Sequence, residues 1–221
     1  MTSKSIFIVG SSGHGRSVLD VVRRHYTDSE IFFFDDFKIK NSIQYGIKVL
    51  GPIEEISEAY KKYGAIGVII AIGNNWDRYL VYRKVKKYPE ANFISAVHPS
   101  ADIGNDVIIN HGTVIMPGAV IGPGVHIGSH CIINSHATVE HDCILDDFSH
   151  IAPGAVLAGN VRLGLKSYVG LGAKIIEKRN IGSNAVIGAG AVVLSDIQND
   201  MIAYGVPAKE IRQKKSDEKY F

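Results

Sequence analysis

The chain has 221 residues and a formal net charge of +2, and 46% of its residues are hydrophobic. This length holds one large domain or two small ones, and the balanced charge argues against nucleic acid as a partner. No apolar run is long enough to span a membrane or to form a secretory signal, so we expect a cytoplasmic protein without a membrane span.

The first hundred residues alternate between apolar runs and amphipathic segments. An apolar run over residues 5–10 precedes a glycine-rich turn at residues 10–15, and an amphipathic pattern then continues to His25. Further strands are expected at Ile31–Phe34, Ala65–Gly73 and Phe93–Val97, and helices at Pro52–Tyr63 and from Asn74 to about Lys87. This alternation predicts a small Rossmann-like α/β domain over residues 1–98.

Three loops at the carboxyl ends of the predicted strands carry glycine or polar residues. The first reads Gly10-x-x-Gly13-x-Gly15, and its backbone N–H groups at a helix start suit a phosphate. Asp35 and Asp36 end the second strand, where an acid binds a ribose in dinucleotide folds, and Gly73-Asn74 ends the third. Since open parallel sheets bind ligands at this edge, we predict a nucleotide diphosphate site. A nicotinamide oxidoreductase is an alternative, but it needs a catalytic domain with a hydride-accepting pocket, and the repeat stretch that follows residue 98 is a poor candidate for one.

The stretch from Ile103 to Gln198 consists of sixteen consecutive hexads without an insertion. The first residue of every hexad is Ile, Leu or Val, and the fifth is small or apolar except at Arg179. A period of six keeps the first and fifth residues on one face of a strand, and six is not near a multiple of the helical 3.6. The stretch therefore predicts a hexapeptide-repeat β-helix.

This stretch resembles the left-handed parallel β-helix of hexapeptide-repeat acyltransferases, in which three hexads make one triangular coil. Sixteen hexads would then stack to roughly 25 Å at about 4.8 Å per rung. We assign residues 99–198 to the β-helix domain and residues 199–221 to a C-terminal tail. Within the tail we expect a short helix from Pro207 and a frayed end over Lys214–Phe221.

One histidine of the β-helix stretch stands out from the other five. His141 takes the third hexad place, at a corner, and Asp142 follows it directly. An acid hydrogen-bonded to one imidazole nitrogen fixes the tautomer and makes the other nitrogen a better base. A metal site is the competing interpretation, but His136 and His141 fall on different faces of the triangle, so no metal is expected. Cys131 and Cys143 take the fifth place and should be buried, which argues against a nucleophile or a disulfide.

Several strings spread over the whole chain carry a resemblance to a known family. They are Gly10-Ser11-Ser12-Gly13-His14-Gly15, Phe34-Asp35-Asp36-Phe37-Lys38, Ala71-Ile72-Gly73-Asn74-Asn75, Glu140-His141-Asp142-Cys143, Phe148-Ser149-His150, Ala158-Gly159-Asn160-Val161 and Gly205-Val206-Pro207-Ala208-Lys209. The chain resembles the bacterial sugar O- and N-acetyltransferases, which include the sialic acid O-acetyltransferase and the UDP-4-amino-sugar N-acetyltransferase of bacillosamine synthesis. The second of these is the closer likeness.

The resemblance implies a homotrimer with each active site between two β-helices, and acetyl-CoA as co-substrate. It implies His141 as the general base and Asp142 as its neighbouring acid, although the bacillosamine enzyme has Glu there. It places Asn134 near the sugar amine. The positions that match the nucleotide-sugar pocket are Ser12, Gly13, His14, Asp35, Asp36, Gly73 and Asn74. The positions that match the CoA site are His150, Gly159, Leu171 and Ala189.

We therefore expect an N-acetyltransferase that transfers acetyl from acetyl-CoA to the 4-amino group of a nucleotide-linked 4-amino-4,6-dideoxy sugar. UDP is the expected nucleotide, with dTDP or GDP as alternatives. The amine would attack the thioester directly while His141 removes its proton, so no acyl-enzyme is needed. Two other functions stay open: O-acetylation of sialic acid or a related sugar, and a non-catalytic trimer that only binds nucleotide sugar.

Overall fold

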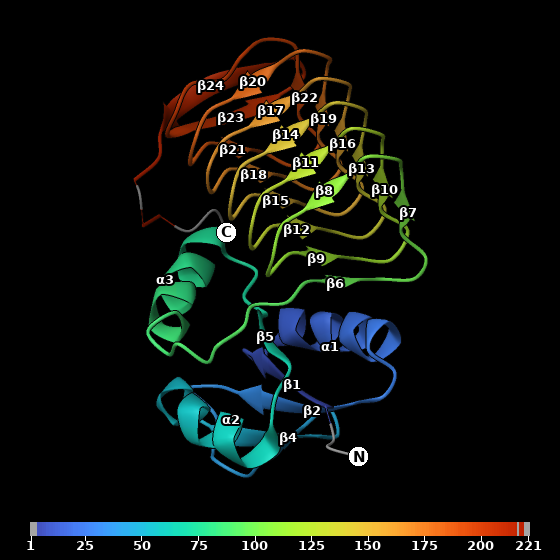
Figure 1. The fold of residues 1–221 in the computed structure, drawn as a ribbon. Coiled ribbons are helices and arrows are strands. Elements are labelled where there is room, and N and C mark those ends of the chain that lie inside the picture. The colour runs from blue at the N-terminus through green and yellow to red at the C-terminus, as the bar shows by residue number, and fades with distance from the viewer. Residues whose placement is uncertain (1–3, 216, 219–221) are drawn as a thin grey trace.

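The structure is a computed structural model, and it describes residues 4–215 and 217–218. An N-terminal α/β domain lies at one end of a stack of short β coils, and α3 lies beside that stack (Figure 1). The elements of the N-terminal domain are β1 (Lys4–Val9), α1 (Gly13–His25), β2 (Ser29–Phe34), β3 (Ile43–Gln44), β4 (Ile47–Gly51), the 3-10 helix η1 (Ile53–Glu55), α2 (Ile56–Tyr63), β5 (Gly67–Ile70) and α3 (Asn75–Val85).

The N-terminal sheet has the strand order β3-β4-β2-β1-β5, and β1 pairs in parallel with both β2 and β5. Val18 and Leu19 of α1 pack on one face of this sheet, while Ile56 of α2 and Val85 of α3 pack on the other. The predicted Rossmann-like domain is therefore confirmed. Because β1, β2 and β5 are parallel to one another, their carboxyl ends meet at one edge, as the ligand-site prediction requires.

Sixteen two-residue strands follow in the β-helix, one for each predicted hexad. They are β7 (Asp102–Ile103), β8 (Ile108–Ile109), β9 (Val114–Ile115), β10 (Val120–Ile121), β11 (His126–Ile127), β12 (Ile132–Ile133), β13 (Thr138–Val139), β14 (Ile144–Leu145), β15 (His150–Ile151), β16 (Val156–Leu157), β17 (Arg162–Leu163), β18 (Tyr168–Val169), β19 (Lys174–Ile175), β20 (Asn180–Ile181), β21 (Val186–Ile187) and β22 (Val192–Val193). Each strand pairs in parallel with the strand three places along the chain, so three hexads make one coil. The predicted left-handed β-helix is confirmed.

The coils form a prism with three faces, and these faces fix where every site residue lies. The first face contains β7, β10, β13, β16, β19 and β22, and the second contains β8, β11, β14, β17 and β20. The third face contains β6 (Ala96–Val97), β9, β12, β15, β18 and β21, and it ends with β23 (Met201–Gly205) and β24 (Ala208–Gln213). The chain passes from the first face to the second, then to the third, and so crosses three corners in each coil.

The corners turn at the fourth hexad residue, which has a positive φ at all fifteen corners from residue 106 to residue 190. Six of these residues are glycine and six are Asn, Asp or His, the types that tolerate this conformation best. The exceptions are Phe148, Lys166 and Lys178. Phe148 packs against the rings of Tyr79 and Tyr82, so tertiary contacts with α3 offset its local backbone preference.

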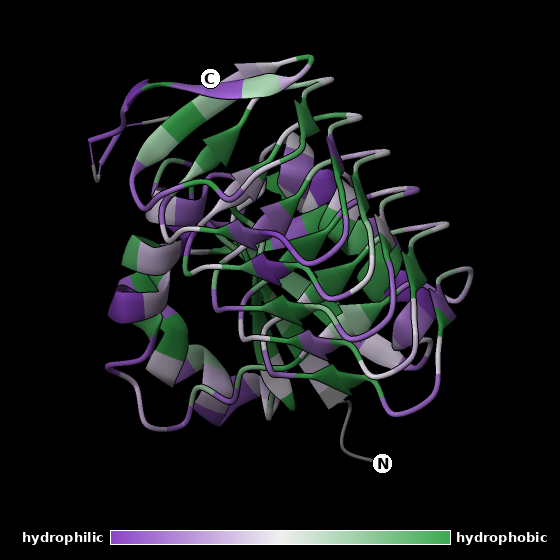
Figure 2. Cartoon of the chain, turned by 90° about the horizontal axis from the view of Figure 1, so that it is seen from above, coloured by the Kyte–Doolittle hydropathy of each residue, from purple (hydrophilic) through white to green (hydrophobic). Residues whose placement is uncertain are grey.

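The first and fifth hexad residues fill the interior of the prism. Viewed from above, the coils stack on one another, and hydrophobic residues gather in their strands (Figure 2). Cys131 and Cys143 are free and completely buried, as predicted from their fifth-place register. Burial raises the pKa of each thiol to about 11, so neither thiolate is accessible at neutral pH.

Two predicted elements are wrong. The run Phe93–Val97 is not a strand of the N-terminal sheet: Phe93 forms only an isolated bridge with Val68, and Ala96–Val97 pairs with β9. The parallel ladder of the third face thus begins at Ala96–Val97, before Pro99 and before the predicted boundary at residue 98. Pro207 does not start a helix, because the residues after it form β24, which pairs antiparallel with β23 and so satisfies the backbone of both strands.

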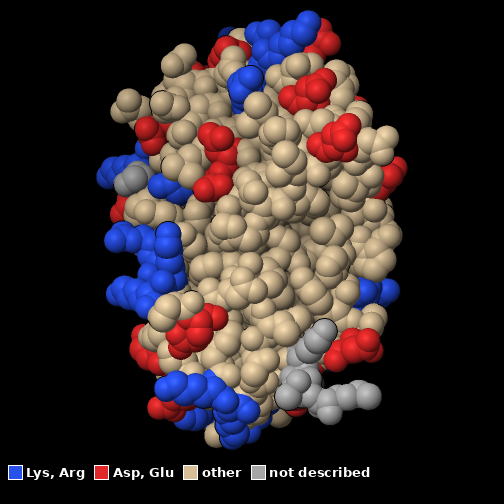
Figure 3. All heavy atoms as spheres, in the orientation of Figure 1, with Lys and Arg blue, Asp and Glu red and all other residues tan. Residues whose placement is uncertain are grey.

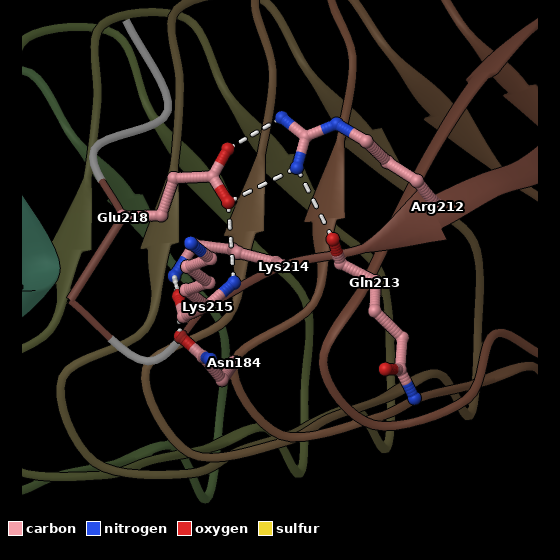
Figure 4. Close-up of polar contacts among 6 residues, drawn as sticks. All are labelled: Asn184, Arg212, Gln213, Lys214, Lys215 and Glu218. Carbon is pink, nitrogen blue, oxygen red and sulfur yellow. Dashed lines mark hydrogen bonds and ion pairs between the residues drawn. The ribbon is translucent and has the colours of Figure 1, made fainter.

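The described end of the tail folds back on the uppermost coil (Figure 4). Lys214 Nζ donates a hydrogen bond to Asn184 Oδ1 at 2.7 Å, and Arg212 forms a two-pronged ion pair with Glu218. The predicted frayed end, Lys214–Phe221, falls partly outside the described residues. Within residues 4–215 and 217–218, no helix has the length and apolarity that crossing a membrane would demand.

Candidate active site

The first two predicted loops of the nucleotide site are joined by the carboxylate of Asp35. Its Oδ2 accepts hydrogen bonds from the backbone N–H of Ser11 at 2.9 Å and from Ser11 Oγ at 2.6 Å. Its Oδ1 accepts one from the Phe37 N–H at 3.0 Å. Asp35 therefore fixes the glycine turn after β1 against the loop after β2, and Ser12 and Gly13 remain exposed at the start of α1.

Asp36 and Asn74 organise the neighbouring loops. Asp36 Oδ1 accepts a hydrogen bond from the Ile53 N–H at 2.9 Å, and its Oδ2 forms an ion pair with Lys84 of α3 at 3.0 Å. Asn74 caps α3, because its Oδ1 accepts hydrogen bonds from the N–H groups of Trp76 and Asp77. Basic side chains, Arg83 and Lys84 among them, are exposed on α3, and Figure 3 shows Lys and Arg gathered on this side.

A cavity of about 140 Å³ opens between these loops at the carboxyl edge of the sheet. Its lining is mostly apolar. The residues that line it are Val9, Gly10, Ser11, Ser12, Phe34, Asp35, Asp36, Phe37, Ile53, Ile72 and Val81. Phe37 is 95% exposed, so its ring is available to stack against a planar group entering the cavity.

The third loop, at Gly73 and Asn74, lies in contact with the third face of the prism. The Nδ1–H of His150 points to the Gly73 carbonyl at 3.3 Å, and Asn134 Nδ2 lies 3.4 Å from His150 Nε2. Since the Gly73 oxygen needs a donor, Nδ1 carries the proton and Nε2 accepts from the Asn134 amide. The structure thus brings Gly73, His150 and Asn134 together, although their predicted roles differ.

Two histidines next to this loop are held neutral by their surroundings. Burial and the charge of Arg78 lower the pKa of His14 to about 4, and its Nε2 has no hydrogen-bond partner among the described residues. Burial, Arg78 and His14 also hold the pKa of His150 well below its usual value. Both imidazoles are therefore uncharged at neutral pH and can act as hydrogen-bonding groups without adding positive charge.

The predicted base and its acid lie at the corner between the first and second faces. His141 Nδ1 and Asp142 Oδ2 are 2.8 Å apart, and the two side chains are 54% and 60% exposed. The ring rests against Gly159, one coil further along, where a Cβ would come within 2.5 Å of its Nε2. An exposed imidazole with Nδ1 held by an acid presents Nε2 as a proton acceptor.

The other predicted site residues lie at a different corner. Leu171 and Ala189 stack one coil apart at the corner between the third and first faces, and Asn134 lies at the same corner lower in the prism. Gly159 instead shares the corner of His141. The whole first face separates these two corners, so a single chain does not bring His141 together with Asn134.

Sequence reasoning missed Arg78, which is fully buried between α3 and the prism. The signal for it is its position in the first turn of a predicted helix, where a cation opposes the helix dipole. Within the described residues, no group of three His, Cys, Asp or Glu side chains is placed to hold a metal ion.

Comparisons with known proteins agree with this two-part organisation. A family model described as the PglD N-terminal domain matches residues 5–85, and the bacterial transferase hexapeptide model matches residues 100–135 and 124–159. Among curated proteins, the serine acetyltransferase of Buchnera aphidicola is 35% identical over 136 residues, and the UDP-N-acetylbacillosamine N-acetyltransferase of Bacillus subtilis is 33% identical over 111 residues. The matches span 43% and 50% of those relatives, so the chain covers half or less of their length.

Several solved structures, from Neisseria gonorrhoeae and Caulobacter crescentus among other bacteria, match nearly the whole chain. The acetyltransferase domain of PglB from Neisseria gonorrhoeae is 33% identical with a TM-score of 0.87, over 95% of this chain and 100% of that one. It has also been solved in complex with acetyl coenzyme A. The GDP-perosamine N-acetyltransferase of Caulobacter crescentus, solved as a histidine-to-alanine variant with CoA and GDP-perosamine, is 30% identical with a TM-score of 0.88, over 95% of this chain and 97% of that one.

Proposed function

The chain belongs to the bacterial sugar N-acetyltransferases that join a PglD N-terminal domain to hexapeptide repeats, and we propose that it acetylates the 4-amino group of a nucleotide-linked 4-amino-4,6-dideoxy sugar. Acetyl-CoA is the donor in this proposal, and relatives solved with acetyl coenzyme A or CoA support that choice. UDP is the first choice of nucleotide, because the Bacillus subtilis relative carries it in its name. GDP and dTDP are the alternatives.

The observation that carries the proposal is the exposed pair of His141 and Asp142 at a corner of the prism, with the imidazole seated on Gly159. In the proposed reaction the sugar amine attacks the thioester carbonyl, and Nε2 of His141 removes the amine proton as the C–N bond forms. Asp142 holds the tautomer that leaves Nε2 free to accept. General-base help of this kind typically contributes about 10²–10⁴-fold.

The remaining acceleration would come from positioning and from stabilising the oxyanion. The tetrahedral intermediate places negative charge on the former thioester oxygen, and the backbone N–H of Gly159 beside His141 is the proposed donor to it. CoA leaves as the thiolate and takes up a proton, for which protonated His141 is the proposed source. No acyl-enzyme is required, in keeping with the burial of Cys131 and Cys143.

We propose a homotrimer as the working form, because one chain carries the parts of the site at two corners. If the corner with His141 from one chain meets the corner with Asn134 from its neighbour, each interface forms one complete site. Such a heterologous contact closes into a ring with three copies. The first face would then line the centre of the ring. Three of its six outward side chains are Val, and the other three are polar or charged: Val120, Val156 and Val192 beside Thr138, Asp102 and Lys174.

A thiol-release assay tests the proposed function. The protein is incubated with acetyl-CoA and, in turn, UDP-, dTDP- and GDP-linked 4-amino-6-deoxy sugars and free sialic acid. We expect CoA release with one of the nucleotide-linked amines. Release with sialic acid alone would assign O-acetylation instead, and no release with any acceptor would favour a trimer that only binds nucleotide sugar.

A further inference from the structure

Arg78 links the third loop of the nucleotide site to the prism. Its side chain is about 1% exposed, and it projects from the first turns of α3. On the N-terminal side it donates hydrogen bonds to Ile72 O, Gly73 O and Asn75 Oδ1. On the prism side it donates to His130 O, Phe148 O and Ser149 O, so both domains supply three acceptors to one guanidinium.

The geometry of these bonds needs the planar fork of an arginine. Nε donates to His130 O at 2.8 Å, Nη1 reaches Ile72 O and Gly73 O at 2.9 Å each, and Nη2 reaches Phe148 O at 2.9 Å. All five N–H groups of the guanidinium thus find acceptors that point from different directions. Lysine offers three donors around a single nitrogen and cannot satisfy this spread of acceptors.

Helix stability does not explain a cation at this position. Arg78 lies close to the N-terminal end of α3, where the helix dipole disfavours positive charge, and burial of a charged group is itself costly. A surface arginine on the same helix, Arg83, shows the ordinary alternative, with its guanidinium 6.0 Å from the ring centre of Tyr79. What Arg78 adds is a fixed position for the Ile72–Gly73 loop relative to the prism.

The loop that Arg78 holds is in contact with other residues of the candidate site. Ile72 lines the 140 Å³ cavity, so its carbonyl contact with Arg78 holds one wall of the nucleotide site. The Gly73 carbonyl accepts from both Arg78 and His150 Nδ1–H, and His150 Nε2 in turn faces the amide of Asn134. A displaced Gly73 carbonyl would therefore release the orientation of two side chains on the third face.

We propose that Arg78 is a positioning residue, which holds the Ile72–Gly73 loop, and through it His150 and Asn134, in the arrangement that binds the nucleotide sugar. This inference rests on the proposed function for the identity of the ligand. It assigns Arg78 to nucleotide-sugar binding and not to CoA binding. Three of the four predicted CoA positions, Gly159, Leu171 and Ala189, lie at corners that Arg78 does not contact. The inference moves the fourth, His150, to the nucleotide-sugar side, because its Nδ1–H donates to the Gly73 carbonyl and its Nε2 faces Asn134.

The test compares nucleotide and CoA binding in two variants and a control. Arg78→Lys keeps the charge without the fork, Arg78→Gln keeps two N–H donors without the charge, and Arg83→Gln removes an exposed arginine from the same helix. Isothermal titration calorimetry measures the affinity of each variant for CoA and for one nucleotide. That nucleotide is whichever of UDP, dTDP and GDP the unaltered protein binds most tightly. Thermal unfolding of each variant is followed in parallel.

We expect both Arg78 variants to bind the nucleotide at least about tenfold more weakly, the scale of one well-placed hydrogen bond. CoA affinity should stay within twofold of the unaltered protein, and Arg83→Gln should leave both affinities unchanged. If an N-acetyltransferase activity is found, the KM for the nucleotide sugar should rise while the KM for acetyl-CoA does not, with Arg78→Lys less affected than Arg78→Gln.

Several results would overturn the inference. Equal weakening of nucleotide and CoA, or failure of both Arg78 variants to fold, would leave Arg78 a purely structural residue. Unchanged nucleotide affinity would remove it from the site, and an unaltered protein that binds none of the three nucleotides would remove the ligand itself. Nucleotide binding without CoA release in the acceptor panel would reject the proposed reaction but leave the role of Arg78 to be judged on affinity.

Discussion

The imidazole of His141 lies directly against Gly159 of the next coil, and no larger residue fits beneath it, since a Cβ would meet Cε1 and Nε2 at 2.5 Å. Gly159→Ala should therefore push the ring out of its seat. We expect turnover to fall on the order of a hundredfold, the cost of misplacing a reacting group by about 1 Å. Glu177→Ala is the matched control, because Glu177 lies one coil further along the same corner and is exposed. Equal activity of the two variants would separate the ring position from catalysis.

Removing the proposed base gives the most direct test of the mechanism. His141→Ala should lower turnover by at least about a hundredfold, within the range of general-base catalysis, while nucleotide affinity hardly changes. Asp142→Asn should cause a smaller loss, because it removes the charge but keeps a group beside Nδ1. His126→Ala, at an exposed position on the second face, is the control. A near-normal rate for His141→Ala would remove His141 from the role.

The stability of the fold should depend on pH through His130. This ring is buried among Tyr82, Phe93 and Phe148, neither nitrogen has a partner among the described residues, and burial, His111 and Arg78 lower its pKa to about 3. The unfolded chain binds a proton near pH 6.5 that the folded chain does not, so stability is complete above that pH and declines as the pH falls toward 3.

Thermal unfolding between pH 7 and pH 4.5 measures this dependence. Each histidine of this kind lowers the free energy of unfolding by up to about 1.4 kcal/mol for every pH unit below 6.5. His130→Phe fills the same aromatic cluster without a titrating nitrogen, so its unfolding temperature should vary less steeply with pH. His126→Ala should keep the slope of the unaltered protein. Parallel slopes for His130→Phe and the unaltered protein would exclude His130 as a source of the acid sensitivity.

The proposed trimer makes the first face essential to activity. Val120→Glu together with Val156→Glu would place three pairs of carboxylates around the centre of the ring, so we expect monomers and a loss of CoA release. Light scattering coupled to size exclusion measures the mass. Arg162→Glu changes charge on the second face and should preserve both assembly and activity. An active monomer of the double variant would contradict a site shared between chains.

The periodicity of the hexads was enough to predict the prism, because a period of six repeats the same inward pair of residues at every strand. It also located His141 at a corner. It could not predict that Phe148 and Lys166 would adopt a positive φ, since those residues disfavour it locally and are held by contacts with α3. The strand β24 was mistaken for a helix for a different reason: Pro207 suits a helix start, but the residues after it pair with the neighbouring strand β23, which itself pairs with β21 of the prism.

Site residues could be predicted where their role follows from their place in a local element, such as the end of a strand. They could not be predicted where their hydrogen-bond partners belong to the other domain. Asp35, Asp36 and Gly73 were identified because they end strands, and the structure places them at one edge as expected. Arg78 falls inside the helix predicted from Asn74 to about Lys87, and nothing near it in the sequence reveals that its partners are carbonyls of the prism. The orientation of His150 toward Gly73 is likewise set by how the domains pack.

The hairpin of β23 and β24 has a bearing on how the protein behaves in concentrated solution. A prism of stacked rungs presents open backbone groups at its end, and such groups can template a second molecule end to end. On the third face β24 occupies that end with Lys209, Glu210 and Arg212 on an antiparallel strand. The hairpin thus caps the end of the prism. Removing residue 208 and those after it would expose a strand edge on which further molecules could add end to end, even though every coil beneath it remained intact.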